Sequence, residues 1–396
     1  MLSTSLEFVP EHDEAFFSAL PTSPAVFLIR GAEAGEPYVS KTANLRRRLV
    51  RLLGASDVPS RRLNLRQRTR FVEYTTTASD FESGFLLYRV LRQVFPRTYS
   101  TRLRLRFAPI VKLHLDNEYP RASITTRMGR SRSGSAYYGP FPSRAAAEKF
   151  ANDSLDFFKM RRCVEDLNPD PAFPGCIYSE MKMCLAPCFK GCSDDEYRSE
   201  VSRVKAYFDS GGESLLRELA QEREQASADL EFEQAAAIHT KIEKLKPVLS
   251  QHPEIVHRID KLSALLIQTS SQPESVNFFR VDAGRISGPL TFSVHQQIVP
   301  GGKSPSMESR VLESFAAIEN SHGTSSLETM EHLALLKRWY YRSQRIGEIF
   351  FADDKGTLPL RRIVRGVSRV YRGEKPEPEP LPLVTINQAG PEEPRP

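Results

Sequence analysis

Apolar and polar positions along the first hundred residues predict short strands followed by amphipathic helices. Three apolar runs, rich in β-branched and aromatic side chains, predict strands at 25–30, 37–40 and 71–76. Apolar residues that recur every three or four positions predict helices over 45–53 and 80–95. Together these elements predict a small α+β unit, with a three-stranded sheet, over residues 15–108.

Polar residues mark the predicted ends of both helices. Asn44 can cap the first helix, which Gly54 ends. In the second helix, Ser79 at the N-cap and Glu82 three positions later form a capping box. Glu82 is therefore open to two interpretations, as part of a helix cap or as a metal ligand.

The pattern divides the rest of the chain into four further regions: 109–192, 193–250, 251–372 and 373–396. The first combines strand-like pieces with all five cysteines. The second predicts a helical hairpin that breaks near 228–233, where Leu230 and Phe232 are either buried between its helices or exposed to a partner. The third predicts an α+β region with a helix over 327–349. The last is rich in proline and acids and predicts a disordered tail.

Basic residues concentrate in one part of a chain whose formal net charge is +6. Residues 30–112 contain 18 Lys and Arg against six Asp and Glu, and 16 of the 18 are arginine. Because guanidinium groups bind phosphate oxygens in pairs, this bias favours a nucleic acid partner over a merely solvated surface. The arginines that we expect to contact DNA are Arg46, Arg47, Arg51, Arg61 and Arg62.

The cysteines cluster within 30 residues, at Cys163, Cys176, Cys184, Cys188 and Cys192. No signal peptide or membrane-length apolar run is apparent, so we expect a cytoplasmic protein that contacts no membrane and forms no disulfides. Clustered thiols in such a protein predict a metal site formed by the first four. Zinc sites usually contain C-x2-C pairs, and the irregular spacing suits an iron–sulfur cluster at least equally well. The residues alone leave the metal open.

A possible phosphodiester-cleaving site lies in the N-terminal unit. Tyr38 and Arg48 flank a predicted strand-to-helix turn, so both can face one pocket. Hydrolysis needs a base and a cation that neutralises the phosphate. Cations such as Lys41 would lower the pKa of Tyr38 toward that of a base, and Glu82 could hold a divalent metal. The alternative is a strand aromatic beside a capped helix.

Four motifs, in this order, resemble the UvrC family of bacterial nucleotide-excision repair over residues 20–250. The stretch from Leu20 through "EPYVSKTANLRRRL" (36–49) is similar to the start of its GIY-YIG nuclease domain. "YYGPF" (137–141) is similar to a motif of its middle region, and the spacing of the first four cysteines resembles its iron–sulfur site. "DLEFEQAAAIHTKIEKL" (229–245) resembles the UVR motif, the hairpin that meets UvrB.

The resemblance implies roles for individual residues. Tyr38 would be the general base, supported by Lys41, while Arg48 would contact the phosphate and Glu82 would bind Mg2+ or Mn2+. A [4Fe–4S] cluster is implied rather than zinc, on Cys163, Cys176, Cys184 and Cys188. The implied partners are damaged double-stranded DNA and, through 229–245, UvrB.

The sequence also departs from the family pattern. Phe27 and Ser40 replace a tyrosine and a glycine of the nuclease motifs, Leu52 replaces a helix tyrosine, and an asparagine expected near Tyr99 is missing. Residues 251–372 show neither an acidic triad nor a helix-hairpin-helix signature. The layout is therefore closest to the short, Cho-like members, and implies an endonuclease that makes one incision on the 3′ side. The alternative is a catalytically impaired paralogue that binds DNA and UvrB.

Overall fold

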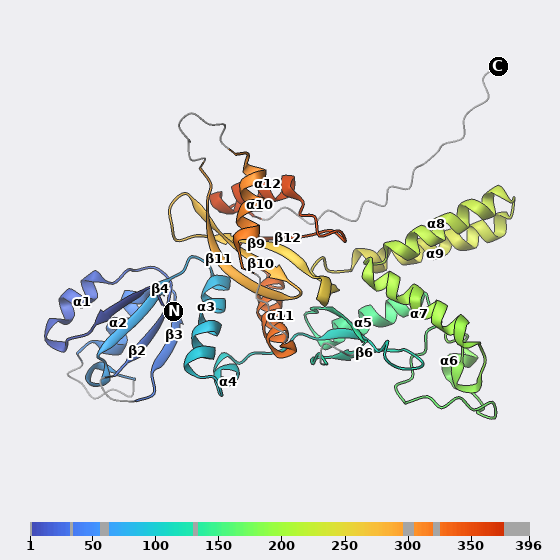
Figure 1. The fold of residues 1–396 in the computed structure, drawn as a ribbon, viewed down its shortest axis with the longest axis horizontal. Helices are drawn as coiled ribbons and strands as arrows, with labels where there is room; N and C mark the ends of the chain where they lie inside the picture. The colour runs from blue at the N-terminus through green and yellow to red at the C-terminus, as the bar shows by residue number, and fades with distance from the viewer. Residues whose placement is uncertain are drawn as a thin grey trace, which may run out of the picture.

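Three four-stranded antiparallel sheets and a projecting helical hairpin make up the protein (Figure 1). The computed structural model describes residues 2–31, 35–55, 63–129, 134–295, 305–319 and 325–375. The mixed helix and strand content confirms the predicted α+β class. Arg61, Arg62 and most of the predicted tail lie outside the described residues.

The N-terminal sheet has the strand order β1-β4-β2-β3. Its strands are β1 (Thr4–Glu7), β2 (Ala25–Arg30), β3 (Tyr38–Thr42) and β4 (Phe71–Thr76). The expectation of three strands is wrong by one, because β1 pairs antiparallel with the outer edge of β4. This strand carries a single large apolar residue, Leu6, which makes it hard to find from hydrophobic alternation.

Helix α2 (Leu45–Leu53) confirms the predicted span and cap, since the Asn44 side chain accepts a hydrogen bond from the Arg47 N–H. Its apolar face packs with α1 (Asp13–Ala19) and the sheet in one buried cluster. Helix α3 (Asp80–Val94) also has the predicted span, but it packs on two sides. Val90 contacts the N-terminal sheet, while Phe81 and Phe85 enter the main core with the C-terminal unit. The short α4 (Tyr99–Leu103) follows.

The middle sheet has the order β6-β5-β7-β8. Its strands are β5 (Ile110–Leu113), β6 (Ala122–Thr125), β7 (Ala136–Gly139) and β8 (His257–Arg258). Strand β8 follows the helical hairpin in sequence, so this sheet joins segments that lie more than a hundred residues apart. Within the YYGPF motif, a Cβ on Gly139 would come within 2.7 Å of the Ile110 side chain. Close packing of β7 on β5 therefore requires glycine there.

Helix α5 (Arg144–Leu155) packs on this middle sheet, and the cysteine segment follows it. Only short elements lie within the cysteine segment, namely α6 (Ile177–Glu180) and the 3₁₀ turn η3 (Pro187–Phe189). With so little regular structure, this segment depends on contacts other than backbone ladders for its shape.

Three helices follow the cysteines, and the last two form the projecting hairpin (Figure 1). They are α7 (Asp194–Asp209), α8 (Glu213–Ala228) and α9 (Phe232–Ser250). The predicted break near 228–233 is present. A second break, at 210–212, was not predicted, and Gly211 and Gly212 adopt positive φ values there, a conformation that glycine adopts without strain.

The C-terminal unit packs helices on a sheet of order β11-β10-β9-β12. Its strands are β9 (Ser263–Thr269), β10 (Ser275–Asp282), β11 (Arg285–Ser293) and β12 (Glu348–Phe351). Its helices are α10 (Met307–Ala317), α11 (Ser326–Tyr340) and α12 (Leu360–Arg372). The helix predicted to reach residue 349 ends at Tyr340, and after a short irregular segment Gly347, at a positive φ, precedes β12.

Candidate nuclease site and cysteine cluster

Tyr38 and Arg48 lie together at the edge of the N-terminal sheet. Tyr38 begins β3, and Arg48 reaches it from the first turns of α2, donating a hydrogen bond from Nη2 to the Tyr38 hydroxyl at 2.9 Å. The centroid of the buried Phe27 ring lies 6.0 Å from that of the Tyr38 ring. The structure thus unites two of the residues that the sequence predicted to share a pocket.

The arginines that we predicted to contact DNA from α2 differ in their surroundings. Arg46 donates to the carbonyl oxygens of Leu20 and Ser18, each at 2.8 Å, and so ties α2 to the end of α1. Arg47 and Arg51 are exposed. Of the arginines predicted to contact DNA, Arg47 and Arg51 are therefore presented to solvent, and Arg46 is largely occupied.

Lys41 makes an ion pair with Asp80, the first residue of α3, and Arg342 pairs with the same carboxylate. These cations hold the pKa of Asp80 below its usual range, even though burial alone would raise it. Lys41 therefore faces a carboxylate that links the N-terminal unit to the C-terminal unit.

Glu82 is buried, with 8% of its surface exposed, and its carboxylate binds groups other than Tyr38. One oxygen accepts from the Ala78 N–H at 2.9 Å, and the other accepts from the Asn277 side chain on β10 at 3.1 Å. The Ser79 hydroxyl accepts from the Glu82 N–H, which completes a cap of α3. Burial raises the pKa of Glu82 despite these hydrogen bonds.

In this arrangement the Glu82 carboxylate is not presented to a divalent ion. It is buried, and each of its oxygens already accepts one hydrogen bond from an amide, so a metal ion would have to compete with these donors. Among the described residues, no group of three or more His, Cys, Asp or Glu side chains is placed to hold a metal ion. The divalent-metal role of Glu82 stays a prediction.

A buried polar network fixes α3 against α11 of the C-terminal unit. Glu331, 1% exposed, accepts hydrogen bonds from the hydroxyls of Tyr88 and Tyr99. Arg92 donates to the Tyr88 hydroxyl and pairs with Glu328. The contacts of Tyr88, Tyr99 and Arg92 with α11 join residues that lie more than 230 positions apart in the sequence.

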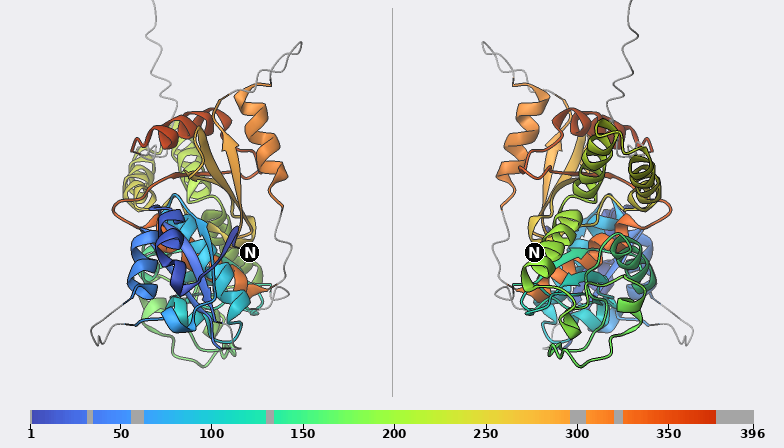
Figure 2. Two further views of the ribbon diagram at one scale, coloured as in Figure 1. Left: turned by 90° about the vertical axis from the view of Figure 1, so that its left-hand side faces the viewer. Right: turned by 90° about the vertical axis from the view of Figure 1, so that its right-hand side faces the viewer.

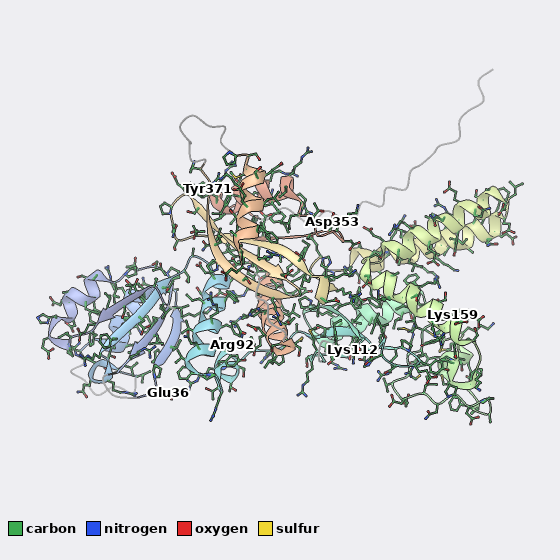
Figure 3. All side chains as sticks on the ribbon, viewed as in Figure 1. Glu36, Arg92, Lys112, Lys159, Asp353 and Tyr371 are labelled. Carbon is green, nitrogen blue, oxygen red and sulfur yellow. The ribbon has the colours of Figure 1, made fainter. Side chains whose placement is uncertain are left out.

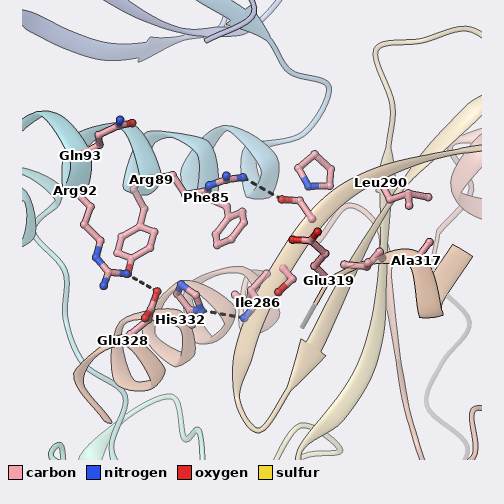
Figure 4. Close-up of a pocket in the computed structure, with 15 residues that line it drawn as sticks. Phe85, Arg89, Arg92, Gln93, Ile286, Leu290, Ala317, Glu319, Glu328 and His332 are labelled. Atoms are coloured by element: carbon pink, nitrogen blue, oxygen red, sulfur yellow. Dashed lines mark hydrogen bonds and ion pairs between the residues drawn. The ribbon is translucent and has the colours of Figure 1, made fainter. Parts of the chain in front are cut away.

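Beside this network lies a pocket of about 610 Å³, between α3 and β11 (Figure 4). Figure 4 shows Arg92 directed at Glu328, and His332 accepting a hydrogen bond from the Ile286 N–H. Burial lowers the pKa of His332 to about 4, so the ring is neutral at pH 7. The walls of the pocket carry arginine, glutamate and apolar side chains together, which indicates no single ligand class.

Four of the cysteines are close enough to influence one another's charge. The pKa of Cys184 is raised to about 11, mainly by burial and in part by the nearby thiols of Cys163, Cys188 and Cys176. Burial also raises the pKa of Cys192, with contributions from the carboxylates of Glu196 and Asp194 and from the Cys188 thiol.

Arg161 was not predicted, and its place beside the cysteines makes it a candidate functional residue. Its guanidinium is 1% exposed and donates to the Cys163 sulfur at 3.4 Å, while the Ala186 N–H donates to the Cys184 sulfur at 3.3 Å. The raised pKa of Cys184 keeps its thiol neutral at pH 7, and these N–H donors would stabilise the thiolate form that a metal ligand requires. The sequence signal was the arginine two positions before Cys163.

The tip of the hairpin exposes its two apolar residues. Leu230 is 70% exposed and Phe232 65% exposed, whereas Ala226 and Ile238 nearby are buried. The interpretation of a buried staple between the helices is therefore wrong. Leu230 adopts a positive φ of 61°, which turns the chain from α8 into α9.

Comparisons with known proteins match two parts of the chain. Residues 109–207 match the family described as "UvrC/Cho excinuclease, middle domain", and residues 213–246 match the "UvrB/uvrC motif". The first match contains the YYGPF motif and the cysteines, and the second contains the hairpin tip. The resemblance to the UvrC family is thereby confirmed for these segments.

Several curated relatives carry the name UvrABC system protein C. That of Methanothermobacter thermautotrophicus is 27% identical over 75% of this chain and 48% of its own length. Those of Alcanivorax borkumensis and Aliivibrio fischeri are 26% and 28% identical, over 78% and 72% of this chain and 49% and 46% of their own lengths. The chain thus spans about half the length of these relatives. No solved structure matches it. Among the described residues, no helix is both long and apolar enough to span a membrane.

Proposed function

We propose that this chain acts in the cytoplasm as a UvrC-like subunit of nucleotide-excision repair, binding damaged double-stranded DNA and UvrB. The supporting observation is a contrast in exposure. Arg47 and Arg51 on α2 and Phe232 at the hairpin tip face solvent, whereas the Glu82 carboxylate is enclosed by amide donors. This arrangement supports recognition more directly than hydrolysis.

DNA binding would rest on the open face of α2. Its arginines have no acidic residue within their own helix, so Arg47 and Arg51 are available to phosphate oxygens. Such contacts hold the protein on a duplex without reading its sequence, which suits a repair protein that must act at any site.

UvrB binding would rest on the hairpin, because exposed leucine and phenylalanine side chains at a tip can fill an apolar groove of a partner. Phe232→Ala should weaken UvrB association at least tenfold in a pull-down or titration, with unchanged thermal unfolding. Ile177→Ala removes a side chain of similar exposure, 63%, from another surface and is the matched control. Equal affinity of the Phe232→Ala variant and the wild type would contradict the assignment.

A second candidate function is a single 3′-side incision near the lesion, with Mg2+ or Mn2+. The Tyr38–Arg48 hydrogen bond favours it, since it holds a phenol and a phosphate-binding cation at one half-buried sheet edge, as a nuclease of this family would require. Lys41 would assist Tyr38, and Glu82 would have to leave Ala78 and Asn277 before it could bind metal.

One experiment separates the two functions. The protein is incubated with UvrA, UvrB, ATP and Mg2+ on duplex DNA that carries one bulky lesion. We expect UvrB-dependent binding without a nick. A 3′-side nick that disappears in Glu82→Ala would instead support the incision, and absence of any UvrB-dependent complex would contradict both functions.

We also propose that Cys163, Cys176, Cys184 and Cys188 bind an iron–sulfur cluster, which would join the loops of this segment. In the described part of the chain these thiols are not arranged as a metal-binding group, so cluster binding would have to draw their side chains together. The support is the grouping of these thiols and the donors that face their sulfur atoms. Anaerobically purified protein should absorb visible light and contain iron, and Cys184→Ser should lose both. Cys192→Ser, the control, should retain both. A colourless protein that contains zinc would contradict this proposal.

A further inference from the structure

Helix α12 carries five arginines and no acidic residue: Arg361, Arg362, Arg365, Arg369 and Arg372. Its opposite face is apolar, and Ile363, Val367 and Val370 are buried in the core of the C-terminal unit. The helix lies across this unit, at the top of both views in Figure 2. The hydrophobic face of α12 is thus buried against the rest of the C-terminal unit.

Two of these arginines have structural partners. Arg369 makes two hydrogen bonds to the buried Glu348 on β12, at 2.8 and 2.7 Å. Arg362 lies 3.8 Å from Glu254 and over the Phe350 ring. These contacts anchor α12 and fix which of its sides faces outward.

The other three arginines form one stripe. With 3.6 residues per turn, Arg361, Arg365 and Arg372 project within about 40° of one another, and the rise per residue spreads them over about 16 Å. All three are exposed. Among the described residues, Arg361 and Arg365 make no ion pair, and Arg372 meets only the exposed Glu374, at 3.4 Å. Figure 3 labels Tyr371, which precedes Arg372 in the chain.

Other surface helices pair their cationic side chains with acidic residues of the same helix. Helix α5 pairs Arg144 with Glu148 and Lys149 with Asp153, and α7 pairs Arg198 with Asp195, in each case within one helix. A helix that only needs a solvated face gains stability from such pairs. Helix α12 lacks them and in this respect matches α2, the helix proposed to contact DNA.

We infer that Arg361, Arg365 and Arg372 form a second contact surface for the phosphate backbone of double-stranded DNA, separate from α2. Three guanidinium groups in a row suit a strand of phosphates, which repeats negative charge along its length. A membrane surface fits less well, because the apolar face that would enter it is buried against the sheet. The C-terminal unit would thereby help to hold the duplex, whether or not incision occurs.

The test uses the full chain and a lesion-free 30-base-pair fluorescent duplex, with affinity measured by anisotropy over a series of salt concentrations. The variant is Arg361→Gln/Arg365→Gln/Arg372→Gln. Loss of three phosphate contacts should reduce the slope of log K against log salt by about 2.7 and weaken binding at least tenfold at low salt. A triple Arg→Lys variant should restore most of the slope, because it keeps the charge.

The matched control is Arg144→Gln/Arg198→Gln/Arg217→Gln, which removes the same charge from exposed positions of α5, α7 and α8. It should leave the slope unchanged. An unchanged slope in the α12 variant, or an equal fall in the control, would overturn the inference. So would binding of wild-type protein to anionic lipid vesicles that the α12 variant loses while its DNA binding stays intact. Because no UvrB is present, failure here would leave the proposed partner binding intact.

Discussion

Helices α2 and α3 bracket one candidate site, yet their polar residues have opposite surroundings. On α2, Arg47 and Arg51 face solvent and Arg48 meets Tyr38 at the sheet edge. On α3, Glu82 and Tyr88 are buried against the C-terminal unit. The polar residues of α2 therefore remain accessible, whereas those of α3 are buried, because α2 is covered on its apolar face alone and α3 packs on two sides.

The largest expected effect is the loss of the acceptor that joins α3 and α4 to α11. Glu331→Ala leaves the buried hydroxyl of Tyr88 and the half-buried hydroxyl of Tyr99 without their carboxylate and opens a cavity. Each unsatisfied buried group costs about 1–3 kcal/mol, so the free energy of unfolding should fall by roughly 4 kcal/mol. Urea denaturation measures this. Glu313→Ala, at an exposed position of α10, should change it by less than about 0.5 kcal/mol.

A pH effect comes next, through His332. Its pKa is about 4 in the folded protein and about 6.5 when unfolded, so the unfolded chain binds the proton first as pH falls. This contribution to stability is complete above pH 6.5 and is lost between pH 6.5 and 4, amounting to roughly 3 kcal/mol. His332→Gln, which can still accept from the Ile286 N–H, should flatten the fall measured by denaturant titration in this window. Parallel pH profiles of the two proteins would contradict the prediction.

A smaller effect compares Glu82 on α3 with Tyr38 on β3, whose hydroxyl meets Arg48 of α2. Glu82→Ala removes the acceptor of the Ala78 N–H and of the Asn277 amide, and should lower the free energy of unfolding by about 2 kcal/mol. Tyr38→Phe should change it by less than about 0.5 kcal/mol, because the hydroxyl lies at a half-buried sheet edge. Thermal unfolding checks both. Equal stability of the two variants would remove the contrast between the helices.

The smallest expected change concerns Arg48. Arg48→Gln should leave stability within about 0.5 kcal/mol of the wild type and reduce the salt slope of DNA binding by about 1, since one phosphate contact is lost. Arg30→Gln, on the same sheet but paired with Glu73, is the control and should not change the slope. A large loss of stability in Arg48→Gln would show that its contact with Tyr38 is mainly structural.

Local patterns in the sequence were sufficient for the elements whose ends are determined by neighbouring residues. Asn44 and Ser79 placed the starts of α2 and α3 correctly, since a cap depends on the three residues that follow it. The break between α8 and α9 was also visible in the local sequence near 228–233. The end of α11 was misplaced, and strand β1 was missed because its pairing with β4 is settled by a distant part of the chain.

The candidate site shows the same division. The sequence by itself determined that Tyr38 and Arg48 would meet, because ten residues of strand, turn and helix join them. Only the tertiary structure decided the surroundings of Glu82 and the cysteines. Asn277 lies 195 positions from Glu82, and the Arg161 guanidinium beside Cys163 is held by the carbonyl of Tyr119, 42 positions away. Long-range packing determines which polar groups are buried. Burial in turn determines whether a carboxylate can act as a metal ligand or as a helix cap.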